Sequence, residues 1–483
     1  MDKPIIELFR TPNSYYLFDV NKNEIIPIDY DSYHYLRELF DLNNQQHSEP
    51  AQVRQLKEQG YLSTVSAVKD VRHIYTDHLQ VFLERKLSKI TLQLTQNCNF
   101  RCKYCIYSEE HSSRQRTHTA VRMTWKTAKK AVDFLREHSV DSPSVNIGFY
   151  GGEPLMEFEL LKKIVRYSLD HFEGKKITYS ITSNGTLLDD EMILFFQEHE
   201  ISLMISLDGP KEINDRNRVF ADGSGTFDKV AERINRIREI APDYASKLQI
   251  SMVMDPDNDF DCINEISLDD SQFSKLSLQP SLVEREYGDE NVKFSEEYSW
   301  KYEYQRFLSI LAYFKRFPQE EVSPITERSL ASAITDYPQI ENGTPLQMIE
   351  APSGPCIPGQ LRLFVNVYEQ LFPCERVSEK SPPMCIGTLD DGFNLENAKK
   401  ILNVGQLTGK ACQSCWCFRH CMLCAKKADD GSEQLSAKKK LNYCEEARTS
   451  AYFKLYQHLL LKEIPLYYCE QMRSHSGEGG MYI

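Results

Sequence analysis

The stretch Thr95-Gln-Asn-Cys98-Asn-Phe-Arg-Cys102-Lys-Tyr-Cys105 places three cysteines at the spacing C-x3-C-x2-C. A closed [4Fe–4S] cube needs four protein ligands, and these are usually Cys thiolates. Three thiolates leave one iron open to an exogenous ligand. Catalytic metal sites keep such an open position, whereas structural sites are closed by protein ligands. Taken alone, the same spacing also permits a zinc site or a redox-active Cys-x-x-Cys pair.

Alternating strand and helix patterns surround this stretch over residues 88–280. The expected strands are Ile90–Thr95, Val145–Tyr150, Ile177–Thr182, Ile201–Leu207 and Leu248–Met254, with another near Leu276–Leu278. Helical patterns lie between them, for example at Thr124–His138 and Asp228–Ile240. The alternation predicts βαβ units and a parallel sheet, with the cysteine run at the carboxyl end of the first strand.

The expected strands alternate in polarity as well. Ile90, Leu92 and Leu94 alternate with polar residues, and Ile201–Leu207 repeats the pattern. A closed (β/α)8 barrel usually carries bulky apolar residues on both faces of its strands. We therefore expect the apolar face to pack on helices and the polar face to line an open cavity, in a partial (β/α)6 barrel. An ordinary doubly wound sheet is the alternative.

Composition narrows the classes of protein. The 483 residues predict roughly three domains. The net charge of −13 argues against a nucleic-acid binder, and the longest apolar runs are too short for a membrane span. Fourteen cysteines without an export signal point to the reducing cytoplasm, where clustered cysteines bind metal or do chemistry.

Three short motifs follow the second, third and fourth expected strands in order, and a fourth lies just beyond the last of them. They are Gly151-Gly152-Glu153-Pro154, Thr182-Ser183-Asn184-Gly185-Thr186, Ser206-Leu-Asp208-Gly-Pro210 and Asn214-Asp215-x-x-Arg218. Paired glycines allow a ligand to approach the backbone closely, and Glu153 offers an acceptor for an ammonium group. Each motif alone is more typical of a turn or a helix cap than of a site.

Together with the cysteine run, these motifs resemble the radical S-adenosylmethionine (SAM) family, whose pattern is a three-cysteine cluster loop, GGE(P), TSNG, SLDGP and HDxxR. Asn214 stands where the family usually has His. The resemblance implies that Cys98, Cys102 and Cys105 hold a [4Fe–4S] cluster. It also implies a SAM site formed by Tyr104, Gly151, Gly152, Glu153, Ser183, Asn184, Ser206, Asp208 and Arg218.

Residues 346–450 are rich in cysteine and resemble the SPASM domain, which carries two auxiliary [4Fe–4S] clusters. The resemblance implies that Cys356, Cys374 and Cys424 hold the first and that Cys412, Cys415, Cys421 and Cys444 hold the second. Two departures stand out: Glu369 occupies the expected Gly, and Cys424 comes one residue early. Cys385 or Cys417 could complete the first cluster, or one iron could stay open. Two zinc sites are the alternative.

Residues 1–75 resemble the winged-helix leader-recognition module of radical SAM peptide maturases. A hairpin of Tyr15–Val20 and Glu24–Ile28 precedes short helices near Ser32–Phe40 and Ala51–Glu58, with Gly60 as a stop. Such a module binds an extended leader peptide by strand addition. A packing domain and a nucleic-acid winged helix remain alternatives.

The remaining segments connect these units. Residues 76–87 are expected to form a linker helix, and 281–345 a helical bridge with a helix near Tyr298–Phe317. Residues 451–483 are expected to form a C-terminal helix and a mobile tail.

The combined resemblance implies a cytoplasmic radical SAM/SPASM oxidoreductase that uses SAM and three [4Fe–4S] clusters to mature a ribosomally made precursor peptide. The preferred reaction joins a Cys sulfur to a carbon as a thioether, as in sactipeptide and ranthipeptide synthases. Expected partners are a Cys-containing precursor, with its leader on residues 1–75, and a reductant such as flavodoxin or ferredoxin. Alternatives are carbon–carbon or carbon–oxygen crosslinking, sulfatase-maturase-like side-chain oxidation, and a non-catalytic iron–sulfur carrier or zinc scaffold. No catalytic acid or base is assigned.

Overall fold

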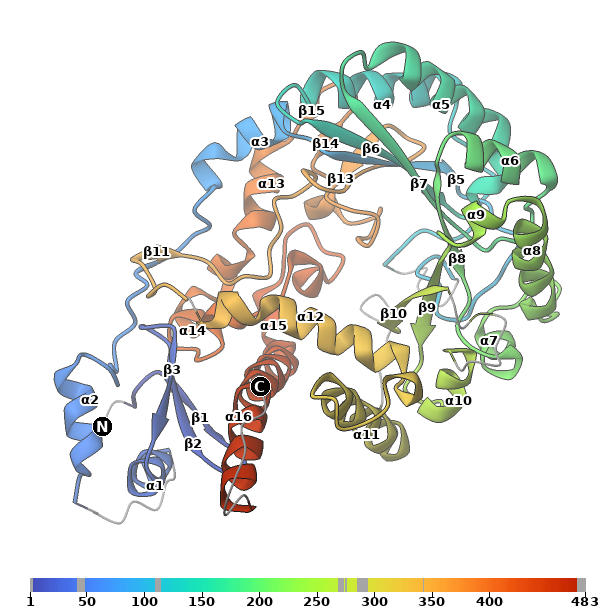
Figure 1. Ribbon diagram of the computed structural model, residues 1–483. Helices are drawn as coiled ribbons and strands as arrows, with labels where there is room; N and C mark the ends of the chain where they lie inside the picture. The colour runs from blue at the N-terminus through green and yellow to red at the C-terminus, as the bar shows by residue number, and fades with distance from the viewer. Residues whose placement is uncertain are drawn as a thin grey trace.

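The computed structural model describes residues 3–40, 48–108, 114–267, 273, 276–284, 294–341 and 343–475 (Figure 1). The tail expected at the C-terminus lies outside these residues from 476 onward. None of the described helices combines the length and the apolar composition needed to cross a bilayer.

Six parallel strands form the central sheet, in the order β10-β9-β8-β7-β6-β5. Their bounds are β5 (Lys89–Thr95), β6 (Ser144–Gly151), β7 (Lys176–Ser183), β8 (Ser202–Ser206), β9 (Gln249–Met254) and β10 (Ser277–Leu282). All six expected strands are therefore present, and the parallel sheet is confirmed.

Helices cover the outer face of this curved sheet (Figure 1). They are α4 (Trp125–His138), α5 (Phe158–His171), α6 (Asp190–Glu198), α7 (Lys211–Asn217), α8 (Phe227–Ile240), α9 (Pro242–Ala245) and α10 (Phe260–Asn264). Ile90, Leu92 and Leu94 are fully buried within the core that these helices share with the sheet. The fold is α/β, with a partial barrel that leaves one side of the sheet open.

The polar face of the sheet lines a cavity over some strands and is covered by other parts of the chain over others. Thr182, Ser206 and Ser251 on β7, β8 and β9 line a cavity, as expected. The same expectation is wrong for β5, where Gln93 is fully buried. Its side chain donates to Glu379 Oε1 at 2.6 Å and accepts from the Val367 backbone at 3.2 Å. The C-terminal region covers this strand, so the cavity begins only beyond it.

The C-terminal region also extends the central sheet. Strand β12 (Leu363–Val365) pairs in parallel with β5, and an antiparallel series continues outward from it. These outer strands are β13 (Gln370–Phe372), β14 (Gly387–Thr388) and β15 (Gly392–Phe393). The barrel and the cysteine-rich region therefore share one ten-stranded sheet.

Glu369 lies in the turn between β12 and β13 with φ of +65°, in the left-handed region. Glycine adopts this conformation without strain, which explains why the SPASM pattern has Gly here. In this chain the Glu369 carboxylate instead bonds to α4, through Lys130 Nζ at 2.7 Å and Thr127 Oγ1 at 3.0 Å. The side chain compensates for the strain by tying the turn to the barrel.

Two substitutions at Glu369 separate strain from side-chain contact. Glu369→Ala loses both contacts and keeps the strain, whereas Glu369→Gly loses the contacts and relieves it. We expect the Gly variant to be more stable than the Ala variant by about 1 kcal/mol, measured by denaturant unfolding. An Ala variant as stable as the Gly variant would mean that the turn is unstrained.

The N-terminal unit contains an antiparallel sheet in the order β1-β2-β3. Its elements are β1 (Ile6–Arg10), β2 (Tyr15–Asp19), β3 (Glu24–Ile28), α1 (Tyr30–Glu38) and α2 (Ala51–Glu58). The expected hairpin and both helices are present, and β1 is an additional strand. Gly60 follows α2 with φ of +82°, in agreement with its expected role as a helix stop.

This N-terminal sheet packs against the C-terminal helix α16 (Cys444–His475) (Figure 1). The rings of Phe9 and Tyr452 stack with centroids 4.8 Å apart. Thr11 Oγ1 and Tyr16 Oη both donate to Glu463 Oε1, at 2.6 and 2.7 Å. The two ends of the chain are thus held together, a contact that the sequence pattern does not indicate.

Short elements join these parts. A two-stranded sheet pairs β4 (Asp70–Val71) with β11 (Ile349–Glu350). The other helices are α3 (Leu79–Arg85), α11 (Glu296–Tyr313), α12 (Pro324–Glu341), α13 (Leu395–Leu402), α14 (Gly409–Gln413) and α15 (Ala437–Asn442). The expected linker helix corresponds to α3, and the helix expected near Tyr298–Phe317 corresponds to α11.

Candidate active site

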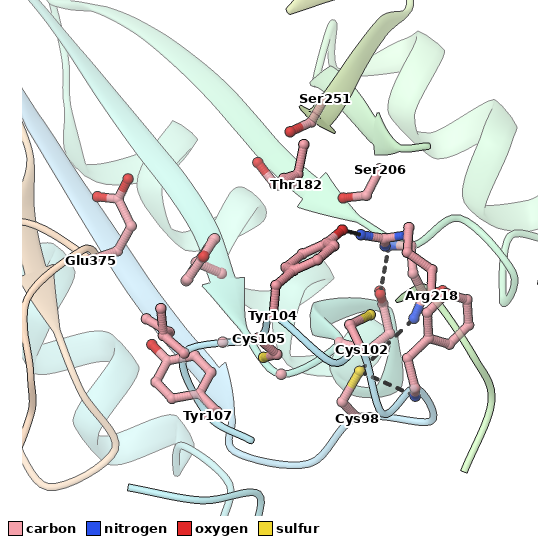
Figure 2. Close-up of a pocket in the computed structure, with 18 of the residues that line it drawn as sticks. Cys98, Cys102, Tyr104, Cys105, Tyr107, Thr182, Ser206, Arg218, Ser251 and Glu375 are labelled. Carbon is pink, nitrogen blue, oxygen red and sulfur yellow. Dashed lines mark hydrogen bonds between the residues drawn. The ribbon is translucent and has the colours of Figure 1, made fainter. Parts of the chain in front are cut away.

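A cavity of about 290 Å³ lies at the carboxyl ends of the parallel strands (Figure 2). Its lining includes the three cysteines of the cluster loop and most of the residues that the resemblance assigns to SAM. These are Cys98, Cys102, Tyr104, Cys105, Gly151, Gly152, Glu153, Ser183, Asn184, Ser206 and Arg218. Asp208 is the one assigned residue that is not part of the lining.

Glycine is required at positions 151 and 152 for a different reason from the expected approach of a ligand. The cluster loop crosses directly over them, with Gly152 N donating to Thr95 O and Glu153 N to Asn97 O, both at 2.8 Å. A Cβ on Gly152 would lie 2.0 Å from Asn97 O, and one on Gly151 would lie 2.3 Å from Thr95 O. The close approach that requires glycine is therefore that of the cluster loop.

The three thiols of the loop are well suited to an iron–sulfur cluster. Burial raises the pKa of Cys98 to about 12 and that of Cys102 to about 11. Cations bound to the sulfurs would offset this burial, because a coordinated thiol is deprotonated. Phe100 N donates to Cys98 Sγ at 3.4 Å, and Asn184 Nδ2 lies 4.0 Å from it. N–H donors toward sulfur are among the features that stabilise protein-bound clusters.

No set of three His, Cys, Asp or Glu side chains converges on a single metal ion among the described residues. Each thiolate of a four-iron cube bonds to its own iron, so cluster ligands surround a volume and need not meet at a point. The three thiols of the loop suit a cluster because of their chemistry as sulfur ligands, although they do not converge on a single point.

Glu153 is almost completely buried at the edge of the cavity. Its carboxylate accepts from Ser183 Oγ at 2.8 Å, from Asn184 N at 2.8 Å and from Leu155 N at 3.0 Å. A carboxylate has about four lone-pair sites, so one remains for a ligand ammonium. Burial raises the pKa of Glu153, while these hydrogen bonds favour its charged form.

Tyr104 and Arg218 lie beside the cysteines (Figure 2). With Asp208 they form a group in which Asp208 and Arg218 are buried and Tyr104 is half-buried. Tyr104 Oη donates to Asp208 Oδ2 and accepts from Arg218 Nη1 at 2.8 Å. Asp208 Oδ1 also accepts from Val253 N at 3.1 Å. Burial raises the pKa of Asp208, and the nearby Arg218 opposes that change. Asp208 therefore acts by holding Tyr104 and β9 rather than by facing the cavity.

Asn214, the departure from the family pattern, is fully buried behind this group. Its Oδ1 accepts from Asp208 N at 3.3 Å, and its Nδ2 donates to Thr226 Oγ1 at 3.0 Å. Both contacts fix the turn after β8, so an amide satisfies this position.

The far end of the cavity carries residues that the sequence analysis did not single out. They are Tyr107, His118, Tyr150, Glu284, Glu375, Arg376 and Lys426. Glu375 Oε1 pairs with Arg362, while Oε2 is buried and has no hydrogen-bond partner. Burial and two nearby arginines lower the pKa of His118 to about 4, so its ring is neutral at pH 7. The position of Glu375 directly after Cys374 was the available signal.

Cys356, Cys374 and Cys424 come from three segments that meet near this end of the cavity. Burial raises the pKa of both Cys356 and Cys374. The charge of Cys424 adds to the rise at Cys356, and the charge of Cys356 adds to the rise at Cys374. A Cβ on Gly354 would lie 2.4 Å from Leu423 O, so the two loops are in close contact. The structure brings together the three residues that the resemblance assigns to the first auxiliary cluster.

Cys412, Cys415, Cys421 and Cys444 form a second group, in which the charges of the first three act on Cys444. Cys417 lies near this group, because its thiol lowers the pKa of both Cys415 and Cys421. The Cys417 thiol itself donates to Ala447 O at 3.5 Å. Cys385 Sγ lies 3.4 Å from Gly387 O, and its side chain packs against the main core, as that of Cys374 does.

Comparison with known proteins agrees with this site. Residues 92–267 match the Radical SAM superfamily. An uncharacterised protein of Methanocaldococcus jannaschii is 36% identical over 137 residues, which cover 28% of this chain and 44% of that protein. A cysteine-type anaerobic sulfatase-maturating enzyme of Clostridium novyi is 27% identical over 165 residues, which cover 33% of this chain and 42% of that enzyme. The matches thus span less than half of either relative.

A solved structure described as native anSMEcpe with bound AdoMet and Kp18Cys peptide has a TM-score of 0.54 at 20% identity. The alignment covers 78% of this chain and 98% of that one. Residues 92–267 therefore form a radical SAM domain. The cysteine-rich region that follows is consistent with a SPASM-like domain.

Proposed function

We propose that this protein is a radical SAM enzyme that forms Cys sulfur-to-carbon thioether links in a ribosomally made precursor peptide. The cavity carries the proposal, because it joins two ends of different chemistry. One end has the three-thiol loop and the SAM motifs, and the other has Glu375, which directly follows Cys374 of the first auxiliary cysteine group. A substrate between them would be exposed to both.

When bound at the open iron, SAM supplies a 5′-deoxyadenosyl radical that can remove a substrate hydrogen atom. The chain's own residues have positioning tasks. Glu153 would receive the ammonium group of SAM, and the Tyr104–Asp208–Arg218 group would hold the wall beside it. Reactive groups held at near-attack distance gain most of their rate from such positioning.

Thioether formation also releases a proton from the substrate thiol. Glu375 is suited to accept it, because its free Oε2 is buried at the end of the cavity opposite the SAM motifs. Cys356, Cys374 and Cys424 would hold the first auxiliary cluster next to this carboxylate. A three-ligand cluster can bind a substrate thiolate, because iron favours sulfur ligands.

A Glu375→Gln variant is expected to keep SAM cleavage while losing peptide modification, because the amide cannot take up the proton. The measurement counts 5′-deoxyadenosine and modified peptide separately, and the expected result is an uncoupled ratio. Glu379→Gln is the matched control, since Glu379 lies in the neighbouring interface and is not part of the cavity lining. Retained modification in the Glu375 variant would exclude this role.

The leader peptide is proposed to bind residues 1–75 by strand addition at β3, the edge strand beside α2. In the free protein Gln52 occupies part of that edge: its amide donates to Pro27 O at 3.3 Å and accepts from Asp29 N at 2.8 Å. An added strand would make the same bonds. Deleting residues 1–75 is an ambiguous test, because it would uncover the face of α16 that packs on β1 and β2.

Gln52→Ala is a sharper test of leader binding. Removing a competitor for the edge should tighten leader binding by about fivefold, since one or two exposed hydrogen bonds contribute about 1 kcal/mol. Titration calorimetry with the leader peptide measures the change. Weaker or unchanged binding would place the leader on another surface.

Similarity to a cysteine-type anaerobic sulfatase-maturating enzyme favours a second candidate, in which this protein oxidises a side chain of a protein substrate in the manner of sulfatase maturases. Mass spectrometry before and after thiol alkylation separates the two reactions. A thioether consumes one thiol and two hydrogens per link, so a product that retains all its thiols would exclude our proposal. A protein that makes no 5′-deoxyadenosine after cluster reconstitution and reduction would instead be a carrier or scaffold.

A further inference from the structure

Lys440 on α15 is a buried cation beside the second group of auxiliary cysteines. Lys440 is only 2% exposed to solvent. The ammonium Nζ donates to Thr408 Oγ1 at 2.6 Å and lies 3.6 Å from Cys412 Sγ. No carboxylate forms an ion pair with it in the part of the chain that the structure describes.

A buried ammonium without a negative partner costs several kcal/mol, because the lost hydration is not replaced. The groups around Nζ indicate what replaces it. Nζ contacts Cys412 Sγ, and the Sγ of Cys444, one turn further along the chain, lies 3.9 Å from the backbone oxygen of Lys440. Two of the four cysteines assigned to one cluster therefore lie against Lys440, and negative charge on that cluster would compensate the buried cation.

Other charged groups approach this cluster from different elements. The charge of Arg448 on α16 favours the thiolate of Cys415, whereas burial, with a smaller effect of the charge of Cys415, raises the pKa of Glu7 on β1 to about 7. Both groups act on the Cys415 side of the cluster. Lys440 is a buried cation on the side of Cys412 and Cys444.

We propose that Lys440 is a positioning residue that raises the reduction potential of the second auxiliary cluster. The inference rests on the proposed function, because it requires iron on these cysteines. Net charge and hydrogen bonds to sulfur are among the factors that set cluster potentials. Reduction adds a negative charge, and a nearby buried cation stabilises the reduced state more than the oxidised state.

The reaction gives this effect a purpose. Joining a C–H carbon to an S–H sulfur releases one hydrogen atom, taken by the adenosyl radical, together with one proton and one electron. The electron must pass to an acceptor within the protein. A cluster that is easier to reduce is a better terminal acceptor, so Lys440 would favour electron flow away from the substrate.

The test uses the full chain with Cys98, Cys102 and Cys105 all changed to Ala, so that only auxiliary iron remains. Redox titration followed by electron paramagnetic resonance gives the midpoint potential of each cluster. Lys440→Met should decrease the equilibrium constant for reduction of one cluster at least tenfold. For one electron this lowers the midpoint potential of that cluster by at least about 59 mV. Lys440→Arg should keep most of the potential.

Two further variants control the measurement. Lys438→Met removes an exposed lysine from the same helix and should leave both midpoints unchanged. Thr408→Val removes a hydroxyl that contacts both Lys440 Nζ and Cys412 Sγ, so it measures the contribution of that hydroxyl and not that of the cation. If Lys440→Met fails to retain iron, Lys440→Gln decides, because it keeps a hydrogen-bond donor and loses the charge.

Each outcome has a separate meaning. Unchanged midpoints in Lys440→Met with full iron content, or in Lys440→Gln if the Met variant loses iron, would overturn the inference alone. Absence of iron from the parent triple variant would overturn the auxiliary-cluster assignment on which it rests.

Discussion

A Cys102→Ala variant is expected to produce no 5′-deoxyadenosine above background from SAM under reducing conditions. Cys102 is one of three thiols at the carboxyl end of β5, and two remaining thiolates cannot hold a cube in place. Iron analysis should show a loss equal to one cluster, with auxiliary iron retained. Cys98→Ala and Cys105→Ala are expected to behave in the same way.

Cys262→Ala is the control for this experiment. Cys262 lies on α10 and packs against the main core, away from the cluster loop. The Cys262→Ala variant should retain its iron and should still cleave SAM. Full SAM cleavage in Cys102→Ala, or zinc in place of iron at the loop of the unmodified protein, would contradict the assignment of this site.

The second large effect is expected from Gly152→Ala, which leaves all the cysteines of the cluster loop in place. The added Cβ would lie 2.0 Å from Asn97 O, so the cluster loop or β6 must move. Backbone has no rotamer with which to relieve the overlap, and overpacking typically costs about 1–3 kcal/mol. We expect a lower melting temperature, loss of iron from the first cluster and loss of SAM cleavage.

Gly409→Ala provides a matched control at the start of α14. A Cβ there would meet only Val71 Cγ2, at an ordinary 3.9 Å. Its stability should equal or exceed that of the unmodified protein, because Ala is the better helix former. If Gly152→Ala were equally harmless, the crossing of the loop over these glycines would not be a constraint on the site.

Local patterns were sufficient to predict much of the fold. The period-two alternation in Ile90–Thr95 and Ile201–Leu207 identified strands, because one face had to be buried under helices. The turn chemistry of Asn21–Asn23 and the stop at Gly60 identified the hairpin and the end of α2. Motif order also predicted the site, since the carboxyl ends of parallel strands meet at one edge of a sheet.

Contacts between distant segments were not predictable in this way. Gln93 looks like a cavity residue within its own strand, yet a segment almost 300 positions later buries it. Glu369 looks like a departure from a pattern until its φ and its bonds to Lys130 and Thr127 are seen. Glu375 follows Cys374 directly, but only the tertiary structure shows that it lines the cavity with a carboxylate oxygen that has no hydrogen-bond partner.

The sequence by itself determined the order of the strands and helices and the clustering of chemically active residues at strand ends. These features depend on interactions between residues a few positions apart, which repeat along the chain. Only the tertiary structure decided what covers each polar side chain: the loop over Gly152, the C-terminal region over β5 and the cysteines around Lys440. Burial and electrostatics depend on neighbours in space, and chain folding brings those neighbours from positions that no local pattern specifies.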